Sequence, residues 1–205
     1  MRVIQLVLSS VNTLNESESM TQPSILVLVG SLRAASTNRQ LADAAIEASA
    51  DDATLSVFDG LAEIPFYNED IDVEGSVPEA AVRFRDAVAA ADAVLVLTPE
   101  HNGTIPAVLK NAIDWASRPF GQGSISGKPL AVIGSAYGQF GGVWAQDEAR
   151  KAFGIAGANV LDDVKLSIAG SVVRFAETHP RDDADAVERL TAVVAALTAA
   201  ARPAA

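Results

Sequence analysis

The stretch ILVLVGSLRAASTNRQL, residues 25–41, decides the fold of this chain. Its first five residues are all apolar, a pattern typical of a strand that helices cover on both faces in a parallel sheet. Gly30 ends this strand, and a loop then leads into a helix. A phosphate binds hydroxyl groups, guanidinium groups and the free amides of a helix N-terminus. The loop offers such donors at Ser31, Arg33, Ser36, Thr37 and Asn38.

This first loop, residues 31–38, matches neither of two common nucleotide-binding motifs. The stretch has only one glycine, so it is not a dinucleotide fingerprint, and no Gly-Lys-Ser/Thr sequence follows, so it is not a P-loop. Two interpretations remain. The loop is either a phosphate cradle or an ordinary strand-to-helix turn that a serine or threonine caps.

Composition excludes several classes of protein. The 205 residues are 49% hydrophobic, enough for a substantial core in one domain. The 15 basic and 26 acidic residues give a net charge of −11, so we expect neither nucleic acid nor an anionic membrane as a partner. The absence of cysteine excludes disulfides, thiolate metal sites and thiol catalysis. No run of eighteen apolar residues exists, so we expect no membrane span.

The first twenty residues read differently from the rest. Arg2 precedes VIQLVL, which faintly resembles a secretory leader, but this largely apolar stretch is only six residues long and a polar stretch follows. We therefore expect residues 1–21 to be a disordered or artefactual extension and residues 22–201 to form the domain. Translation from Met20 would produce that domain with only a few leading residues.

The remaining chain alternates between strand and helix patterns. Such alternation with short connections predicts a parallel sheet with helices on both faces. A capping box, SVPE at residues 76–79, is expected to open the second helix, and the last strand is expected to be interrupted at Asp162 and Asp163. We expect strands at 25–29, 55–58, 93–97, 130–135 and within 159–166, and helices at 38–49, 76–92, 106–117, 142–154 and from 183 onward.

Ligands of such sheets bind outside the carboxyl ends of the strands, where the strand order reverses. This rule selects the first loop and two others. The second loop, residues 98–105, lies in TPEHNGTIP, which is stiffened by two prolines and permissive at Asn102 and Gly103. The backbone amides of a fixed loop of this kind can hydrogen-bond to the edge of a planar heterocycle. In the helix that follows, Trp115 is expected to pack in the core, and Lys110 and Asp114 to form a surface pair.

The third loop, residues 136–141, lies in SAYGQFGG, which has three glycines and two aromatic residues. Glycine lets a flat ring approach the backbone closely, and Tyr137 or Phe140 would cover one face of that ring. The alternative is a flexible glycine turn before a helix.

These three loops together resemble the NADPH-dependent FMN reductase family, whose members have a flavodoxin-like fold. The resemblance runs from Ser24 to about Leu166, and GSLRAASTNRQLA and PEHNGTIPAVLKNAIDW are its most specific parts. It implies a three-layer α/β sandwich with a five-stranded parallel sheet in the order 2-1-3-4-5. It also implies FMN bound without a covalent bond, with NADPH or NADH as co-substrate. The implied FMN-binding residues are Ser31, Arg33, Ser36, Thr37 and Asn38 for the phosphate, Pro99, Glu100, His101, Asn102 and Gly103 along the ring, and Ser135, Gly138 and Gly141 on its other side.

His101 departs from the family pattern, which usually has tyrosine at this position. A substrate-stacking role carried over from tyrosine is therefore in doubt, whereas FMN binding rests on loop shape and backbone groups. Two interpretations of His101 stay open, a solvated surface residue or a proton-transfer group. We assign His179 no role.

The resemblance implies a flavin-dependent oxidoreductase that passes a hydride from NADPH or NADH to FMN and on to a quinone-like or other small electron acceptor. The chemistry would belong to FMN, so we expect no catalytic residue and no metal. We expect a cytoplasmic homodimer or homotetramer. The main alternative is a flavodoxin-type electron carrier that does not itself oxidise a nicotinamide, and a third is a non-flavin interaction domain on the same fold.

Overall fold

The computed structural model describes residues 22–202, and the extension expected over residues 1–21 lies outside them. Most strand and helix bounds agree with the sequence patterns to within one residue. No helix among residues 22–202 is long and apolar enough to cross a membrane. In chain order the strands and α-helices are β1 Ser24–Val29, α1 Thr37–Ala48, β2 Thr54–Val57, α2 Glu79–Ala90, β3 Ala93–Thr98, α3 Ala107–Ala116, β4 Pro129–Ser135, α4 Val143–Ile155, β5 Asn159–Ile168, α5 Ser171–Arg174 and α6 Ala184–Ala201.

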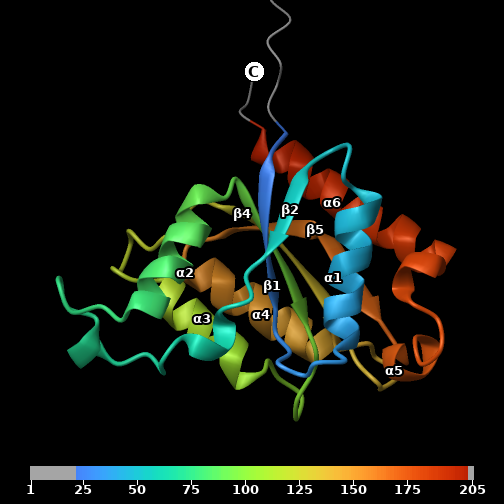
Figure 1. Ribbon diagram of the computed structural model, residues 1–205, viewed down its shortest axis with the longest axis horizontal. Helices are drawn as coiled ribbons and strands as arrows, with labels where there is room; N and C mark the ends of the chain where they lie inside the picture. Colours follow the sequence, from blue (N-terminus) through green and yellow to red (C-terminus); the bar gives the residue numbers. More distant parts are fainter. Residues whose placement is uncertain (1–21, 203–205) are drawn as a thin grey trace, which may run out of the picture.

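The five strands form one parallel sheet in the order β2-β1-β3-β4-β5. This confirms the flavodoxin-like topology. The register pairs Val29 with Leu97, and Thr98 with Gly134, so β1, β3 and β4 end at nearly the same level. The loops that follow these strands therefore leave the sheet side by side, at its lower edge in Figure 1.

Helices cover both faces of the sheet, as the apolar run of β1 predicts. Alternate side chains of β1 point to opposite faces: Ile25 and Val27 lie in the core beneath α1 and α6, and Leu26 and Leu28 lie in the core beneath α2, α3 and α4. Figure 1 shows α1 and α6 on one side of the sheet and α2, α3 and α4 on the other. The result is a three-layer α/β sandwich.

The capping box predicted at residues 76–79 is wrong. Helix α2 begins at Glu79, and its N-cap is Pro78, which makes no side-chain capping hydrogen bond. A proline disfavours helical backbone at the preceding residue, so Val77 stays outside the helix and Ser76 cannot serve as its N-cap. The apolar spacing after the proline is confirmed, because Ala81, Phe84 and Val88 are fully buried in the core.

Strand β5 has the expected interruption. Its register against β4 shifts between Leu130 and Val132, which pair with Val160 and Lys165 respectively. The extra residues on β5 include the exposed Asp162 and Asp163. The Arg150 guanidinium of α4 donates to the carbonyl oxygens of Leu161, Asp162 and Val164 at 3.0, 3.1 and 3.0 Å, which fixes the bulged segment.

Candidate functional site

A cleft of about 600 Å³ lies where the three loops meet at the carboxyl ends of β1, β3 and β4. Clefts of this size suit small molecules and cofactors. Nine of the thirteen residues predicted for the site line it, namely Ser31, Arg33, Ser36, Thr37, Asn38, Pro99, Glu100, His101 and Ser135, whereas Asn102, Gly103, Gly138 and Gly141 do not.

The first loop ends in a capped and buried helix start. Ser36 is the N-cap of α1, and its Oγ accepts a hydrogen bond from the Arg39 amide at 3.3 Å. The predicted cap is therefore present. The amides of Thr37 and Asn38 precede the first backbone bond of the helix, from Gln40 N to Ser36 O, so they are not used within α1 and suit an anion.

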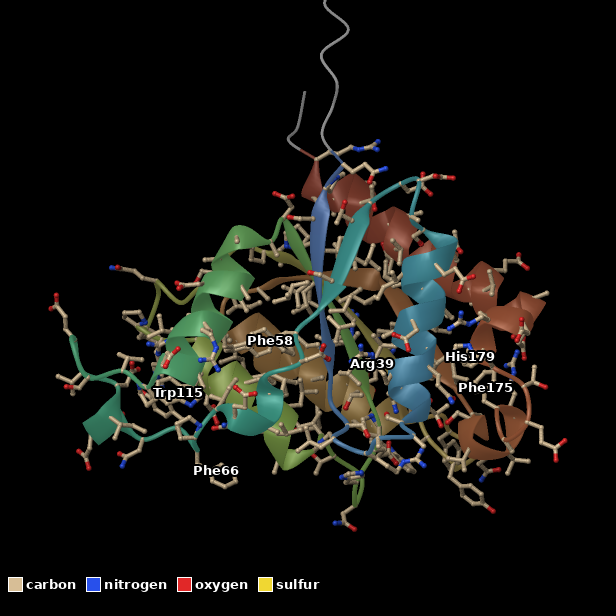
Figure 2. The ribbon with its side chains drawn as sticks, in the orientation of Figure 1. Arg39, Phe58, Phe66, Trp115, Phe175 and His179 are labelled. Carbon is tan, nitrogen blue, oxygen red and sulfur yellow. The ribbon has the colours of Figure 1, made fainter. Side chains whose placement is uncertain are left out.

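The two arginines of this region differ in their partners. Arg39 donates to Asp43 at 3.1 Å and also forms an ion pair with Asp59, just after β2; Figure 2 shows Arg39 beside the segment that carries Phe58. The hydrogen bonds with Asp43 and then Asp59 hold the pKa of Arg39 above its usual value. Arg33 lines the cleft, is exposed, and forms no ion pair within residues 22–202. Arg33 is thus the guanidinium available to a ligand phosphate.

The second loop is built around a tight turn. His101 and Thr104 exchange two backbone hydrogen bonds of 3.0 and 3.1 Å. The residues between them, Asn102 and Gly103, have φ angles of 56° and 76°, the left-handed backbone that a two-residue turn of this kind requires. Asn102 and Gly103 therefore shape the loop from its exposed tip. Neither of these two residues lines the cleft.

The Glu100 carboxylate is directed to the neighbouring helix. Its Oε2 atom accepts hydrogen bonds from the backbone amides of Trp144 and Ala145, at 3.1 and 3.3 Å, in the first turn of α4. Glu100 thus lines the cleft and also connects the second loop to the helix that follows the third.

The third loop is tightly packed at its base and exposed at its tip. Gly141 has a φ of 62°, and a Cβ atom at this position would lie 2.7 Å from Ala169 N, so this glycine is required for close packing against the end of β5. The Gly138 carbonyl accepts from the amides of Gly141 and Gly170. Tyr137 is 71% exposed and lines the cleft. Phe140 instead packs against Trp144, with ring centroids 5.1 Å apart.

Two buried polar atoms in the cleft lining have no hydrogen-bond partner within the described residues. They are Asn38 Oδ1, at the start of α1, and Ser135 Oγ, at the end of β4. Ser49, Ser124 and Thr198 also have an unpaired buried hydroxyl but lie outside the cleft lining, so it is the position of Asn38 and Ser135 in the cleft that makes their atoms available to a polar ligand. Together with Arg33 and the free amides of α1, they fit a phosphate-bearing molecule with further polar groups. Residues 22–202 contain no cluster of side chains that could hold a metal ion.

Several residues of the cleft were not among the predicted site residues. Pro106, Ala107 and Val108 line it from the start of α3, and Ser171 and Val172 from α5. The residues of α5 follow β5, beyond the three motif-bearing loops, and only the strand order brings them to the cleft.

The residues that were assigned no chemistry lie as predicted. Trp115, on α3, is fully buried in the core on this face of the sheet, and its Nε1 donates to the Pro65 carbonyl at 2.8 Å (Trp115 is labelled in Figure 2). Lys110 and Asp114 form an exposed ion pair of 2.6 Å. His179 is outside the cleft lining, and its Nδ1 accepts from the Arg181 amide at 3.2 Å.

Comparison with known proteins gives concordant matches. Residues 23–172 match the model of the family described as NADPH-dependent FMN reductase. The chain is 39% identical over 160 residues to a quinone reductase of Pseudomonas putida, covering 78% of this chain and 85% of that protein. It is 36% identical over 191 residues to the NAD(P)H:quinone oxidoreductase of Solanum tuberosum, covering 88% and 94%. Among solved structures, the NAD(P)H:(acceptor) oxidoreductase FerB of Paracoccus denitrificans matches with a TM-score of 0.78 and 31% identity, covering 87% of this chain and 97% of that one.

Proposed function

Because this chain belongs to the NADPH-dependent FMN reductase family, we propose that it is an enzyme that oxidises NADPH or NADH with bound FMN and reduces a quinone-like acceptor. The observation that carries this proposal is the cleft between the three loops. It combines a free guanidinium, the unused amides of α1 and two unpaired buried polar atoms. The names of the relatives, two of which are quinone reductases, support the class of acceptor.

The proposed roles follow the three loops. The first loop would hold the FMN phosphate with Ser31, Arg33 and the α1 amides. The second loop would lie along the ring, with Pro99 and His101 in the lining and the turn at its tip fixing the shape. The third loop would close the other side, with Ser135 in the lining and the two glycines Gly138 and Gly141 holding the loop backbone.

Bound FMN supplies the hydride chemistry. The chain's own residues bind and orient the cofactor and leave one side of the cleft open to a second molecule. Exposed Tyr137 and His101 lie at this opening, where an aromatic acceptor would bind after the oxidised nicotinamide leaves. A quinone would stack on an exposed aromatic ring of this kind.

Spectroscopy and steady-state kinetics test the proposal directly. The purified protein, supplied with FMN, should show the visible absorption of a bound flavin, and anaerobic NADPH or NADH should bleach it. Menadione should then restore the oxidised spectrum and sustain continuous nicotinamide oxidation. Protein that stays colourless after FMN is added would overturn the proposal. Flavin binding without nicotinamide oxidation would instead favour an electron carrier.

We extend the proposal to assembly and location. A homodimer or homotetramer is supported by exposed apolar side chains that soluble monomers rarely gather: Phe120 is 87% exposed and Ile155 is 77% exposed, and both line a second hollow between the C-terminal ends of α3 and α4. Light scattering of the protein as it elutes from a size-exclusion column would measure the mass of the assembly.

We propose a cytoplasmic location, which the use of NADPH or NADH supports. We also propose that residues 22–201 form the FMN-binding domain.

A further inference from the structure

The first turn of α4 lacks a capping side chain of its own. Its N-cap is Gly142, which makes no side-chain hydrogen bond. The amides of the first turn of a helix have no partner within the helix, and a carboxylate near them is favoured by the helix dipole. Glu100, 44 residues earlier in the chain, supplies that carboxylate to Trp144 and Ala145. A side chain of the second loop thus caps the N-terminus of α4.

The α4 end to which Glu100 is attached is itself fixed to the sheet. Gln146 is buried, and its Nε2 donates to the carbonyl oxygens of Val132 and Leu166, both at 2.7 Å. Gly134 packs so closely on Gly142 that a Cβ atom at Gly134 would lie 2.7 Å from the Gly142 carbonyl oxygen. The start of α4 is therefore a rigid anchor point at the ends of β4 and β5.

Apart from Glu100, few contacts hold the middle of the second loop, although Ile105 at its end packs against the core. Its turn between His101 and Thr104 is internal, and Thr98 Oγ1 donates to the adjacent Pro99 carbonyl. Within residues 22–202, Glu100 alone provides side-chain hydrogen bonds from residues 99–105 to another part of the chain. Loss of this contact would leave the loop attached at its two ends, through β3 on one side and through the packed Ile105 and α3 on the other.

We propose that Glu100 is a positioning residue, which holds the second loop against α4 and thereby fixes the width of the ring part of the cleft. In this role its carboxylate acts on the backbone of α4 and does not contact the cofactor. The identity of the ligand rests on the proposed function, whereas the loop contact itself does not.

Three variants of the full chain test this. Glu100→Ala removes the contact, and Glu100→Gln keeps an acceptor oxygen without the charge. Glu148→Ala is the control, because Glu148 is an exposed glutamate of α4 whose side chain makes no hydrogen bond to any described residue.

The first measurement is amide hydrogen exchange by NMR without added flavin. Exchange at Trp144 and Ala145 should accelerate about 5- to 30-fold in Glu100→Ala, the range that loss of a helix cap produces. It should accelerate less in Glu100→Gln and remain unchanged in Glu148→Ala.

The second measurement is the affinity for FMN and for riboflavin. Both should weaken by the same factor in Glu100→Ala, because the ring and not the phosphate is mispositioned, and Glu100→Gln should recover affinity in proportion to its recovered amide protection. Unchanged exchange at Trp144 and Ala145 would overturn the contact. A loss confined to FMN would overturn a role at the ring. Restored protection without restored affinity would show that the charge acts on the flavin directly, which would also overturn the proposal. A protein that binds no flavin would contradict the proposed function but leave the exchange result standing.

Discussion

The Gly30 amide donates a hydrogen bond to the Leu97 carbonyl at 2.8 Å, which joins the start of the first loop to the end of β3. A Cβ atom at Gly30 would lie 3.4 Å from both Leu97 O and Thr98 Oγ1. The first and second loops therefore begin in direct contact. A cofactor whose phosphate lies in one and whose ring lies along the other is held by two segments that the sheet itself keeps in register.

The free guanidinium of the first loop gives the first prediction. Arg33→Ala should weaken FMN binding by about 1.5–3 kcal/mol, the range for hydrogen bonds to a charged group. Riboflavin, which lacks the phosphate, should bind the variant and the unmodified protein equally. Both affinities are measured by titration of flavin fluorescence. An equal loss for the two ligands would mean that Arg33 does not contact the phosphate.

The unpaired Ser135 hydroxyl gives the second prediction. Ser135→Ala should leave the flavin-free protein as stable as before, to within about 0.5 kcal/mol, because no hydrogen bond is lost. The increase in melting temperature that FMN produces should become smaller. Ser49→Ala is the matched control, since the Ser49 Oγ is also buried and unpaired but lies away from the cleft. Equal FMN-induced shifts in the two variants would contradict a contact at Ser135.

The position that departs from the family gives the third prediction. His101 is exposed in the lining of the cleft, and its backbone forms the turn with Thr104. His101→Tyr should keep FMN affinity unchanged while altering the KM for menadione, because a larger aromatic face changes the surface on which the acceptor lies. Identical quinone kinetics in the two proteins would place His101 outside the working site and leave Tyr137 as the aromatic candidate.

Two glycines in left-handed backbone give the fourth prediction. Gly103→Ala should cost about 1–2 kcal/mol of the free energy of unfolding, from backbone strain alone, because its Cβ would meet no atom within 4 Å. Gly141→Ala should cost about 1–3 kcal/mol more from overpacking, since its Cβ would lie 2.7 Å from Ala169 N. Urea unfolding measures both. Equal costs would refute the close packing at the base of the third loop.

Asp183, the N-cap residue of α6, gives the fifth prediction. Hydrogen bonds from Arg174, and then from the Ala186 amide, lower the pKa of Asp183 to about 2. A carboxyl whose pKa is depressed on folding stabilises the protein above its unfolded value of about 3.9 and loses that contribution as the pH falls toward the folded value. Asp183→Asn keeps a capping side chain but loses the ion pair. It should be less stable by about 1–2 kcal/mol at pH 7, and the difference should shrink between pH 4 and pH 2. Urea unfolding measures the stability of both proteins. A stability difference that stays constant from pH 4 to pH 2 would contradict the lowered pKa of Asp183.

Local sequence patterns predicted the strands and the loops well. Five apolar residues from Ile25 to Val29 and the run from Ala93 to Leu97 are strands in the middle of the sheet, because burial on both faces leaves a signal that neighbouring residues alone can carry. The resemblance then supplied the strand order. The capping box at Ser76 failed since Pro78, two residues later, decides where the helix begins.

Contacts between residues far apart in the sequence could not be predicted from local patterns. Glu100 was predicted beside the cofactor from its motif, yet its partners Trp144 and Ala145 follow at a distance of 44 and 45 residues, and no spacing rule connects them. Ser171 reaches the cleft only because β5 lies next to β4. Likewise Asn102 and Gly103 match the family motif but lie in a tight turn outside the cleft lining, and the motif alone did not predict that position.

The bulge in β5 has a consequence for solubility. Within the sheet formed by residues 22–202, β5 is the last strand, and its outer backbone groups pair with no further strand there, so another chain could add a strand at this edge and begin to aggregate. The shifted register breaks the regular edge at Asp162 and Asp163, whose exposed negative charges repel an incoming strand, and Arg150 already occupies the carbonyl oxygens of the bulge. The side chain that fixes the bulge thus also protects the sheet from uncontrolled growth at this edge.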